Sequence, residues 1–326
     1  MGIKGPIKDL RSGFYNRVDW LVAASSSAGL LAALAAQAGR VSQKLDVLAD
    51  FAPIWLLAGA LATLYGAGRG RRGLFILGLL GIVASADLIA PEIVRPVRPA
   101  VASSAPNQIK LIQYNAWEGN SRTDADAEWL ARQKPDFILV EDAEPPITQA
   151  LVRRGFLLTK GVADVAIFSR APRLKHPFPI PKDQWPLLPV FARGTFEAAD
   201  GKPFSLIAVH LRRPTDRLPL SAAFTLGRLV DNYEKSRLIL AGDFNLAPWS
   251  FSLRQIDRRY GLERRDRALF SWPARLPFSW PAPWPVPFMP IDHVLAGSAW
   301  RTVSITCGPR LGSDHYPVIV ILALEN

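Results

Sequence analysis

The sequence predicts an α/β fold with packed sheets, preceded by an N-terminal transmembrane helical region. Three observations support this prediction: charge-free apolar stretches before residue 95, a proline-rich segment after them, and short strand-like runs that alternate with helical or loop segments from Ile109 onward. The 326 residues suffice for one domain of roughly 200 to 230 residues plus an accessory region. The composition is 49% hydrophobic, which is high for a wholly soluble enzyme, and the excess of hydrophobic residues lies before residue 95.

Residues 1–90 form the predicted membrane region, with two or three transmembrane helices. The apolar segments run from Leu21 to Ala38, from Phe51 to Gly68, and from Gly73 past Asp87 to Ile89. The first two reach about the 18 residues that a spanning helix requires, whereas the third is marginal unless Asp87 lies near an interface. One cleaved signal peptide would not explain three segments. A soluble helical bundle is the alternative, and the scarcity of charge on any helix face disfavours it.

Basic residues near the segment ends predict the orientation. They lie before the first segment (Lys4, Lys8, Arg11 and Arg17), between the second and third (Arg69, Arg71 and Arg72), and only twice in the first loop (Arg40 and Lys44). The positive-inside rule therefore places the N-terminus in the cytoplasm. Three crossings would put everything after about residue 95 outside the cytoplasm. If the third segment does not cross, the remainder of the chain is cytoplasmic.

Residues 91–108 form a predicted proline-rich linker, which contains Pro96, Pro99 and Pro106. Because proline lacks a backbone N–H, such a stretch neither continues a helix easily nor pairs in a central sheet. Residues 109–326 form the predicted soluble domain. The apolar runs that predict its strands are Lys110 to Tyr114, Phe137 to Val140, Val165 to Phe168, Phe204 to Val209, Leu238 to Ala241 and Val318 to Leu322.

Oxygen-bearing side chains follow two of these runs. Asn115 comes directly after the first, and Glu141 and Asp142 come directly after the second. Such oxygen donors suit Mg²⁺ or Mn²⁺ better than zinc, although either segment alone is also typical of a strand-ending turn with solvated polar residues. Cys307 is the only cysteine, so the chain forms no internal disulfide and no multi-cysteine zinc site.

Groups suited to acid–base chemistry follow two later runs. His210 follows one strand and would be able to donate to a phosphoryl oxygen. Asp243 and Asn245 flank Phe244, so in an extended segment both polar side chains point to one face while Phe244 packs on the other. A carboxylate can take a proton from water, and an amide can stabilise an anionic oxygen. A Gly-Asp-x-Asn segment is also an ordinary turn sequence.

Two Asp-His pairs lie closer to the C-terminus, Asp292-His293 and Asp314-His315. An Asp-His pair can hold an imidazolium against a phosphate group. Taken in order along the chain, these polar sets indicate one metal-assisted site that cleaves a phosphoester.

The ordered set resembles the endonuclease/exonuclease/phosphatase superfamily, and the likeness covers about residues 108 to 324. The matching segments are Tyr114-Asn115, the acid at Asp142, Ser169-Arg170, Val209-His210-Leu211, Gly242-Asp243-Phe244-Asn245, Ile291-Asp292-His293 and Ser313-Asp314-His315. The resemblance implies a four-layered α/β sandwich with two central sheets and a divalent-metal phosphoesterase. Pro248-Trp249-Ser250 and the membrane region also resemble a bacterial subgroup, which implies a bacterial inner membrane as the location.

The resemblance implies metal ligands among four residues. Asn115 and the acid after the second strand would bind Mg²⁺ or Mn²⁺, and Asp314 would lie near the metal. The family usually has Gln-Glu where this chain has Glu141-Asp142; the position favours Asp142, but its shorter side chain leaves Glu141 as an alternative. His293, beside Asp292, is expected to be structural.

The resemblance also implies five catalytic residues. His210 would contact the phosphate, Asp243 would orient or deprotonate the attacking water, and Asn245 would stabilise the transition-state oxygens. His315 would act on the phosphate, and Asp292 would fix its imidazole.

The expected partners are the membrane and an anionic phosphoester substrate, such as nucleic acid or a phospholipid headgroup. The net charge of +11 suits an anionic substrate, but many of these charges flank the apolar segments. The Trp- and Pro-rich stretch 271–290, with Trp272, Trp280 and Trp284, would stack bases, hold a lipid chain, touch the bilayer, or simply cover the sheet edge. A non-catalytic membrane-bound binding protein is the alternative to an enzyme.

Overall fold

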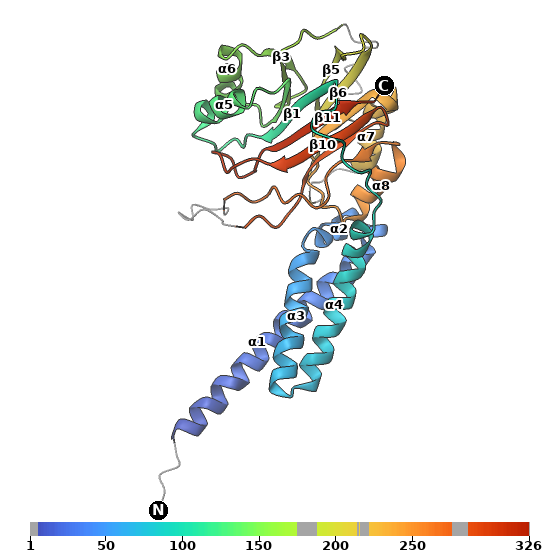
Figure 1. The fold of residues 1–326 in the computed structure, drawn as a ribbon. Coiled ribbons are helices and arrows are strands. Elements are labelled where there is room, and N and C mark those ends of the chain that lie inside the picture. The colour runs from blue at the N-terminus through green and yellow to red at the C-terminus, as the bar shows by residue number, and fades with distance from the viewer. Residues whose placement is uncertain (1–5, 175–187, 214, 216–221, 276–285, 326) are drawn as a thin grey trace, which may run out of the picture. The chain divides into compact units, whose positions relative to one another are not determined.

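The structure is a computed structural model that describes residues 6–174, 188–213, 215, 222–275 and 286–325. The chain divides into two compact units (Figure 1). One comprises Met1–Val94 with Trp249–Phe251, and the other comprises Arg95–Pro248 with Ser252–Asn326. Each unit is described in turn.

The first unit is helical. Its elements are α1 (Pro6–Ala36), η1 (Gln37–Arg40), α2 (Gln43–Asp50), α3 (Ala52–Arg69) and α4 (Arg72–Ile93). Two stretches, Asn16–Arg40 and Arg72–Ile93, are long and apolar enough to cross a membrane. The helices α2 and α3 reach the length and hydropathy of a membrane span only when taken together, and they are bent by 56° at their junction. Length and composition therefore allow two or three spans.

The third apolar segment, which is marginal from the sequence alone, belongs to a helix that is long and apolar enough to cross a membrane. α4 has 22 residues and the highest mean hydropathy of the candidates, 2.2, because the helix continues past Asp87 to Ile93. Pro91 lies inside this helix and does not begin a linker: it removes one donor, but the N–H of Val94 still donates to the carbonyl of Ala90 at 3.1 Å. The segment that decides the number of spans is instead the bent pair α2 and α3.

Small residues let α3 and α4 approach closely. A Cβ at Gly78 would lie 2.4 Å from the hydroxyl oxygen of Thr63, and a Cβ at Gly59 would lie 2.8 Å from the backbone nitrogen of Ile82. Any larger side chain would push the two backbones apart. Close approach through glycine is typical of helix pairs that pack within a bilayer.

The second unit contains two mixed sheets. The strands are β1 (Gln108–Asn115), β2 (Phe137–Glu141), β3 (Leu157–Lys160), β4 (Ala166–Ser169), β5 (Val190–Glu197), β6 (Pro203–His210), β7 (Leu238–Asp243), β8 (Glu263–Arg264), β9 (Asp292–Ala296), β10 (Trp300–Cys307) and β11 (Val318–Leu324). The six-stranded sheet has the order β10-β11-β1-β2-β4-β3, and the five-stranded sheet has the order β5-β6-β7-β9-β8. Among the strands that the structure describes, only β1–β2 and β6–β7 pair in parallel.

The helices in the described part of this unit are α5 (Thr123–Arg132), α6 (Pro145–Arg153), α7 (Ala222–Val230) and α8 (Phe251–Arg259), whose first residue is grouped with the other unit, together with the short 3-10 helix η3 (Lys235–Arg237). Successive side chains along each strand point to opposite faces of its sheet. In β1, Leu111 packs in the core between the sheets, whereas the next residue, Ile112, packs toward α5 and α6. The outer face of the second sheet packs against α7 and α8 in the same way. The predicted four-layered α/β sandwich with two central sheets is thus confirmed (Figure 1).

Register brings the polar strand ends together. His210 pairs with Asp243, and Asp243 pairs with Asp292 across the antiparallel β7–β9 pair. In the other sheet Asn115 pairs with Glu141. The carboxyl ends of the parallel pairs and the beginning of β9 therefore form one edge of the unit.

Candidate active site

Asp243 lies at the centre of the site, at the end of β7. Its Oδ2 atom accepts a hydrogen bond from Nδ2 of Asn115 at 3.0 Å and lies 3.6 Å from Nε2 of His315 and 3.7 Å from Nε2 of His210. The side chain is only 2% exposed. Burial raises the pKa of Asp243, and the charge of Asp292 adds to this effect against the lowering influence of His315 and His210. A carboxylate with a raised pKa is a better proton acceptor.

Glycine at position 242 makes this geometry possible. Gly242 has φ of 153°, and a Cβ there would lie 1.8 Å from the carbonyl oxygen of Val209. Only glycine allows β6 and β7 to lie this close just before His210 and Asp243. The next turn contains Asn245 at φ of 50°, a conformation that asparagine tolerates better than most residues.

His315 is held by Asp292, the pairing that the family resemblance implies. Nδ1 of His315 lies 2.9 Å from Oδ2 of Asp292, which leaves Nε2 directed at Asp243. Burial alone would lower the pKa of His315, but Asp292, Asp243 and Asp314 together raise it to about 10. The imidazole is therefore a cation at neutral pH.

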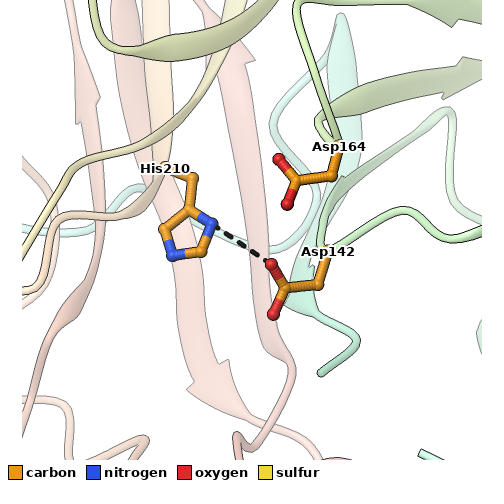
Figure 2. A group of neighbouring side chains, drawn as sticks. All are labelled: Asp142, Asp164 and His210. Carbon is orange, nitrogen blue, oxygen red and sulfur yellow. Dashed lines mark ion pairs between the residues drawn. The ribbon is translucent and has the colours of Figure 1, made fainter. Parts of the chain in front are cut away.

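His210 lies between Asp243 and Asp142, and Figure 2 shows its ion pair with Asp142. Nδ1 of His210 lies 3.4 Å from Oδ1 of Asp142. Burial alone would lower the pKa of His210, but Asp142, Asp243 and Glu141 raise it to about 9. For Asp142, burial would raise the pKa of the carboxyl group, but the hydrogen bond and charge of His210, together with Asp164 and the charge of His315, lower it. Asp142 sits at φ of 50°, just after β2, which turns its side chain toward the second sheet.

Glu141 lies behind the site. Its side chain is fully buried, and Nε2 of Gln113 donates both to Glu141 at 2.8 Å and to Oδ1 of Asp292 at 2.8 Å. Burial raises the pKa of Glu141 well above its usual range, and the charge of Asp292 adds to it. Gln113, itself bonded to Glu141, therefore holds the carboxylate of Asp292 in place. Of the two acids after β2, Asp142 is the one that is open to the site.

Asn245 and Asp314 are hydrogen-bonded to neighbouring protein groups. Nδ2 of Asn245 donates to the carbonyl of Leu211 at 2.8 Å, while its backbone N–H donates to Oδ1 of Asp243 at 2.8 Å. Oδ2 of Asp314 accepts a hydrogen bond from the Trp272 indole at 3.1 Å. The base of the Trp- and Pro-rich stretch thus borders the site, whereas Trp280 and Trp284 lie outside the described residues.

Tyr114 fixes the turn that carries His315. Its hydroxyl donates to Asp126 at 2.7 Å and accepts from the backbone N–H of Ser313 at 3.2 Å, and the Ser313 hydroxyl donates to the carbonyl of Asn115 at 2.7 Å. His293 contacts a separate network: its two ring nitrogens lie 2.8 Å from Asp266 and from the carbonyl of Leu246. It is fully buried, as a structural residue would be.

Two groups of side chains among the described residues have the composition and spacing to hold a cation. One is Asp142, Asp164 and His210, and the other is Asp243, Asp292 and His315, with ligand atoms within 4.8 Å of one another in each group. The carboxylate oxygens suit a hard divalent cation such as Mg²⁺ or Mn²⁺. The first group is the more open of the two, because its three side chains are partly exposed whereas those of the second group are buried. Neither of these groups, within the described part of the chain, includes Asp314 or Glu141.

The fold and this edge of acids and histidines define a phosphoesterase-type α/β sandwich. The family model of the Endonuclease/Exonuclease/phosphatase family matches residues 112–315, and the chain belongs to this family. Members of the family are hydrolases that act on phosphoesters. No curated protein matches the chain.

Solved structures agree on the fold. An endonuclease/exonuclease/phosphatase from Bacteroides vulgatus has a TM-score of 0.52 at 15% identity, with 67% of this chain and 99% of that chain covered. A family protein from Bacteroides thetaiotaomicron gives 0.51 at 17% identity, covering 67% and 98%. The mannosyl-6-phosphatase Bt3783 of Bacteroides thetaiotaomicron VPI-5482 gives 0.51 at 16% identity, covering 66% and 100%.

Proposed function

We propose that the chain is a membrane-anchored phosphoesterase that uses Mg²⁺ or Mn²⁺ and hydrolyses its substrate with activated water. The observation that carries the proposal is the arrangement around Asp243, where one buried carboxylate with a raised pKa faces Asn115 and two cationic histidines. A carboxylate in such a position suits the activation of water, and the cations suit an anionic phosphoryl group.

The roles follow from the contacts. Asp243 orients the attacking water and accepts its proton, while Asn115 holds the carboxylate in place. His315, oriented by Asp292, and His210 donate hydrogen bonds to the phosphoryl oxygens as negative charge develops. Asn245 fixes the Asp243 carboxylate through its backbone N–H. Its side-chain amide is proposed to donate to the substrate after breaking its hydrogen bond to the carbonyl of Leu211.

The cation belongs beside Asp142, with Asn115 and Asp314 as the neighbouring oxygen-bearing groups proposed to support it. A bound divalent cation neutralises charge that develops on the phosphoryl group. Asp142 is a better ligand than Glu141, because Glu141 is enclosed with Gln113 behind the site.

The substrate is proposed to be an anionic phosphoester, either nucleic acid, a phospholipid headgroup or a sugar phosphate. The structural similarity to a mannosyl-6-phosphatase is a reason to include phosphomonoesters. The test is a hydrolysis screen of the full chain, in detergent, against DNA, RNA, phospholipids, inositol phosphates and mannose 6-phosphate, each with Mg²⁺ or Mn²⁺. Hydrolysis of at least one class is expected. A non-catalytic binding protein would bind a phosphoester without cleaving it.

The site is proposed to lie outside the cytoplasm of a bacterium, anchored in the inner membrane. Basic residues lie before α1 and in its N-terminal half, and others lie at the junction of α3 and α4. The positive-inside rule places both regions on the cytoplasmic side if the bent pair α2 and α3 crosses. We expect alkaline phosphatase fused after Asn326 to be active and a fluorescent reporter that folds only in the cytoplasm to be dark. The opposite pattern would mean that α2 and α3 do not cross and that the site faces the cytoplasm.

A further inference from the structure

Asp164 is a carboxylate of the site that belongs to none of the sequence motifs. It lies two residues before β4, which runs antiparallel to β2 with Ala166 opposite Val140. The beginning of β4 therefore lies beside the end of β2. The backbone N–H of Ala143 donates to the carbonyl of Asp164 at 2.6 Å, which ties the turn that carries Asp142 to the turn that carries Asp164.

The side chain of Asp164 faces Asp142 and His210 (Figure 2). One ligand atom from each of the three residues lies within 4.8 Å of the other two. Two carboxylates at this separation repel each other unless a cation or a proton lies between them. His210 supplies one positive charge, but it is shared between Asp142 at 3.4 Å and Asp243 at 3.7 Å. The group therefore has more carboxylates than the imidazolium can neutralise.

We propose that Asp164 and Asp142 together hold the divalent cation, so that Asp164 is a metal ligand of this chain in addition to the residues its family motifs mark. This inference rests on the proposed function. Mg²⁺ typically binds through one or two carboxylates and completes its coordination with water and substrate phosphate. Two carboxylates on adjacent strand ends, tied by a backbone hydrogen bond and open to the site, match that requirement.

The test measures Mn²⁺ binding to the full chain in detergent, without substrate, by calorimetry and by the Mn²⁺-induced rise in unfolding temperature. The variants are Asp164→Asn and Asp142→Asn, with Asp231→Asn as the matched control, because Asp231 is an exposed acid outside the site. Loss of groups that only support a metal ligand already costs 10- to 100-fold in affinity, so a weakening of at least about tenfold is expected for Asp164→Asn. Asp231→Asn should bind as the unsubstituted chain does.

Stability without metal separates a ligand from a structural residue. If Asp164 holds the cation, Asp164→Asn removes repulsion from Asp142, so the metal-free variant should unfold at the same or a higher temperature while its response to Mn²⁺ shrinks. Wild-type Mn²⁺ affinity in Asp164→Asn, together with loss of binding in Asp142→Asn, would overturn the role of Asp164 and leave the proposed function intact. A chain that binds no Mn²⁺ before any substitution would overturn both.

Discussion

Asp243→Asn is expected to reduce turnover by about 10²- to 10⁴-fold on whichever substrate the screen identifies. The substitution keeps nearly the same volume, but an amide cannot accept a proton from water at neutral pH. The Asp243 carboxylate contacts Asn115, His210 and His315 at once, whereas Asp142 contacts only His210 of these three groups and Asp292 contacts only His315. Single-turnover hydrolysis by the variant measures the effect.

Folding has to be separated from catalysis in this comparison. Burial disfavours the charged form of Asp243, so the neutral variant should unfold at a temperature close to that of the unsubstituted chain. Asp231→Asn makes the same chemical change at an exposed position and should leave turnover unchanged. If Asp243→Asn hydrolyses the substrate at near wild-type rate, the position assigned to the base is wrong.

His315→Gln is expected to reduce turnover by about 10²- to 10³-fold, the loss typical of one donor to a developing oxyanion. Glutamine keeps a polar side chain but cannot be cationic. His176→Gln, which lies outside every motif and outside the described residues, should have little effect. Equal loss in both variants would contradict a specific role for His315.

The pH dependence of the same reaction gives an independent measure. Because Asp292 and Asp243 outweigh burial and raise the pKa of His315 to about 10, the imidazolium is present below that value and is lost as the pH rises through it. Turnover of the unsubstituted chain should therefore decline near pH 9, as His210 loses its proton, and further near pH 10, as His315 does. In His315→Gln the decline near pH 9 should remain and the one near pH 10 should be absent, and an unchanged profile would assign the second titration to another group.

Much of the fold was predictable because the signals are local. Five of the six apolar runs that predict strands lie within β1, β2, β6, β7 and β11, and the sixth begins at Val165, one residue before β4. β5 and β10 were not predicted, since Val190–Glu197 and Trp300–Cys307 mix polar residues with apolar ones. The full length of α4 was not predicted, because Asp87 and Pro91 are local signals against a membrane span. The surrounding apolar residues nevertheless form one continuous helix through both.

The site could be predicted in part because its residues end parallel strands. Asn115, His210 and Asp243 meet for this reason, and the contact of Asp292 with His315 is the one that the family resemblance implies. Strand direction was not visible in the sequence. β4 is antiparallel to β2, so Ser169, at its end, pairs with Phe137 away from the site, and Asp164, before its start, lies within it. The burial of Glu141 behind Gln113 also depends on packing that no motif encodes.

The most direct test of the central claim is hydrolysis of the screened substrate by the full chain after chelation and metal addition. The proposed ligands are oxygen donors suited to a hard cation, and Cys307 is the only thiol of the chain. Excess chelator should abolish hydrolysis, and Mg²⁺ or Mn²⁺ added beyond the chelator should restore it to the untreated rate. Full hydrolysis in excess chelator would contradict a divalent-metal phosphoesterase.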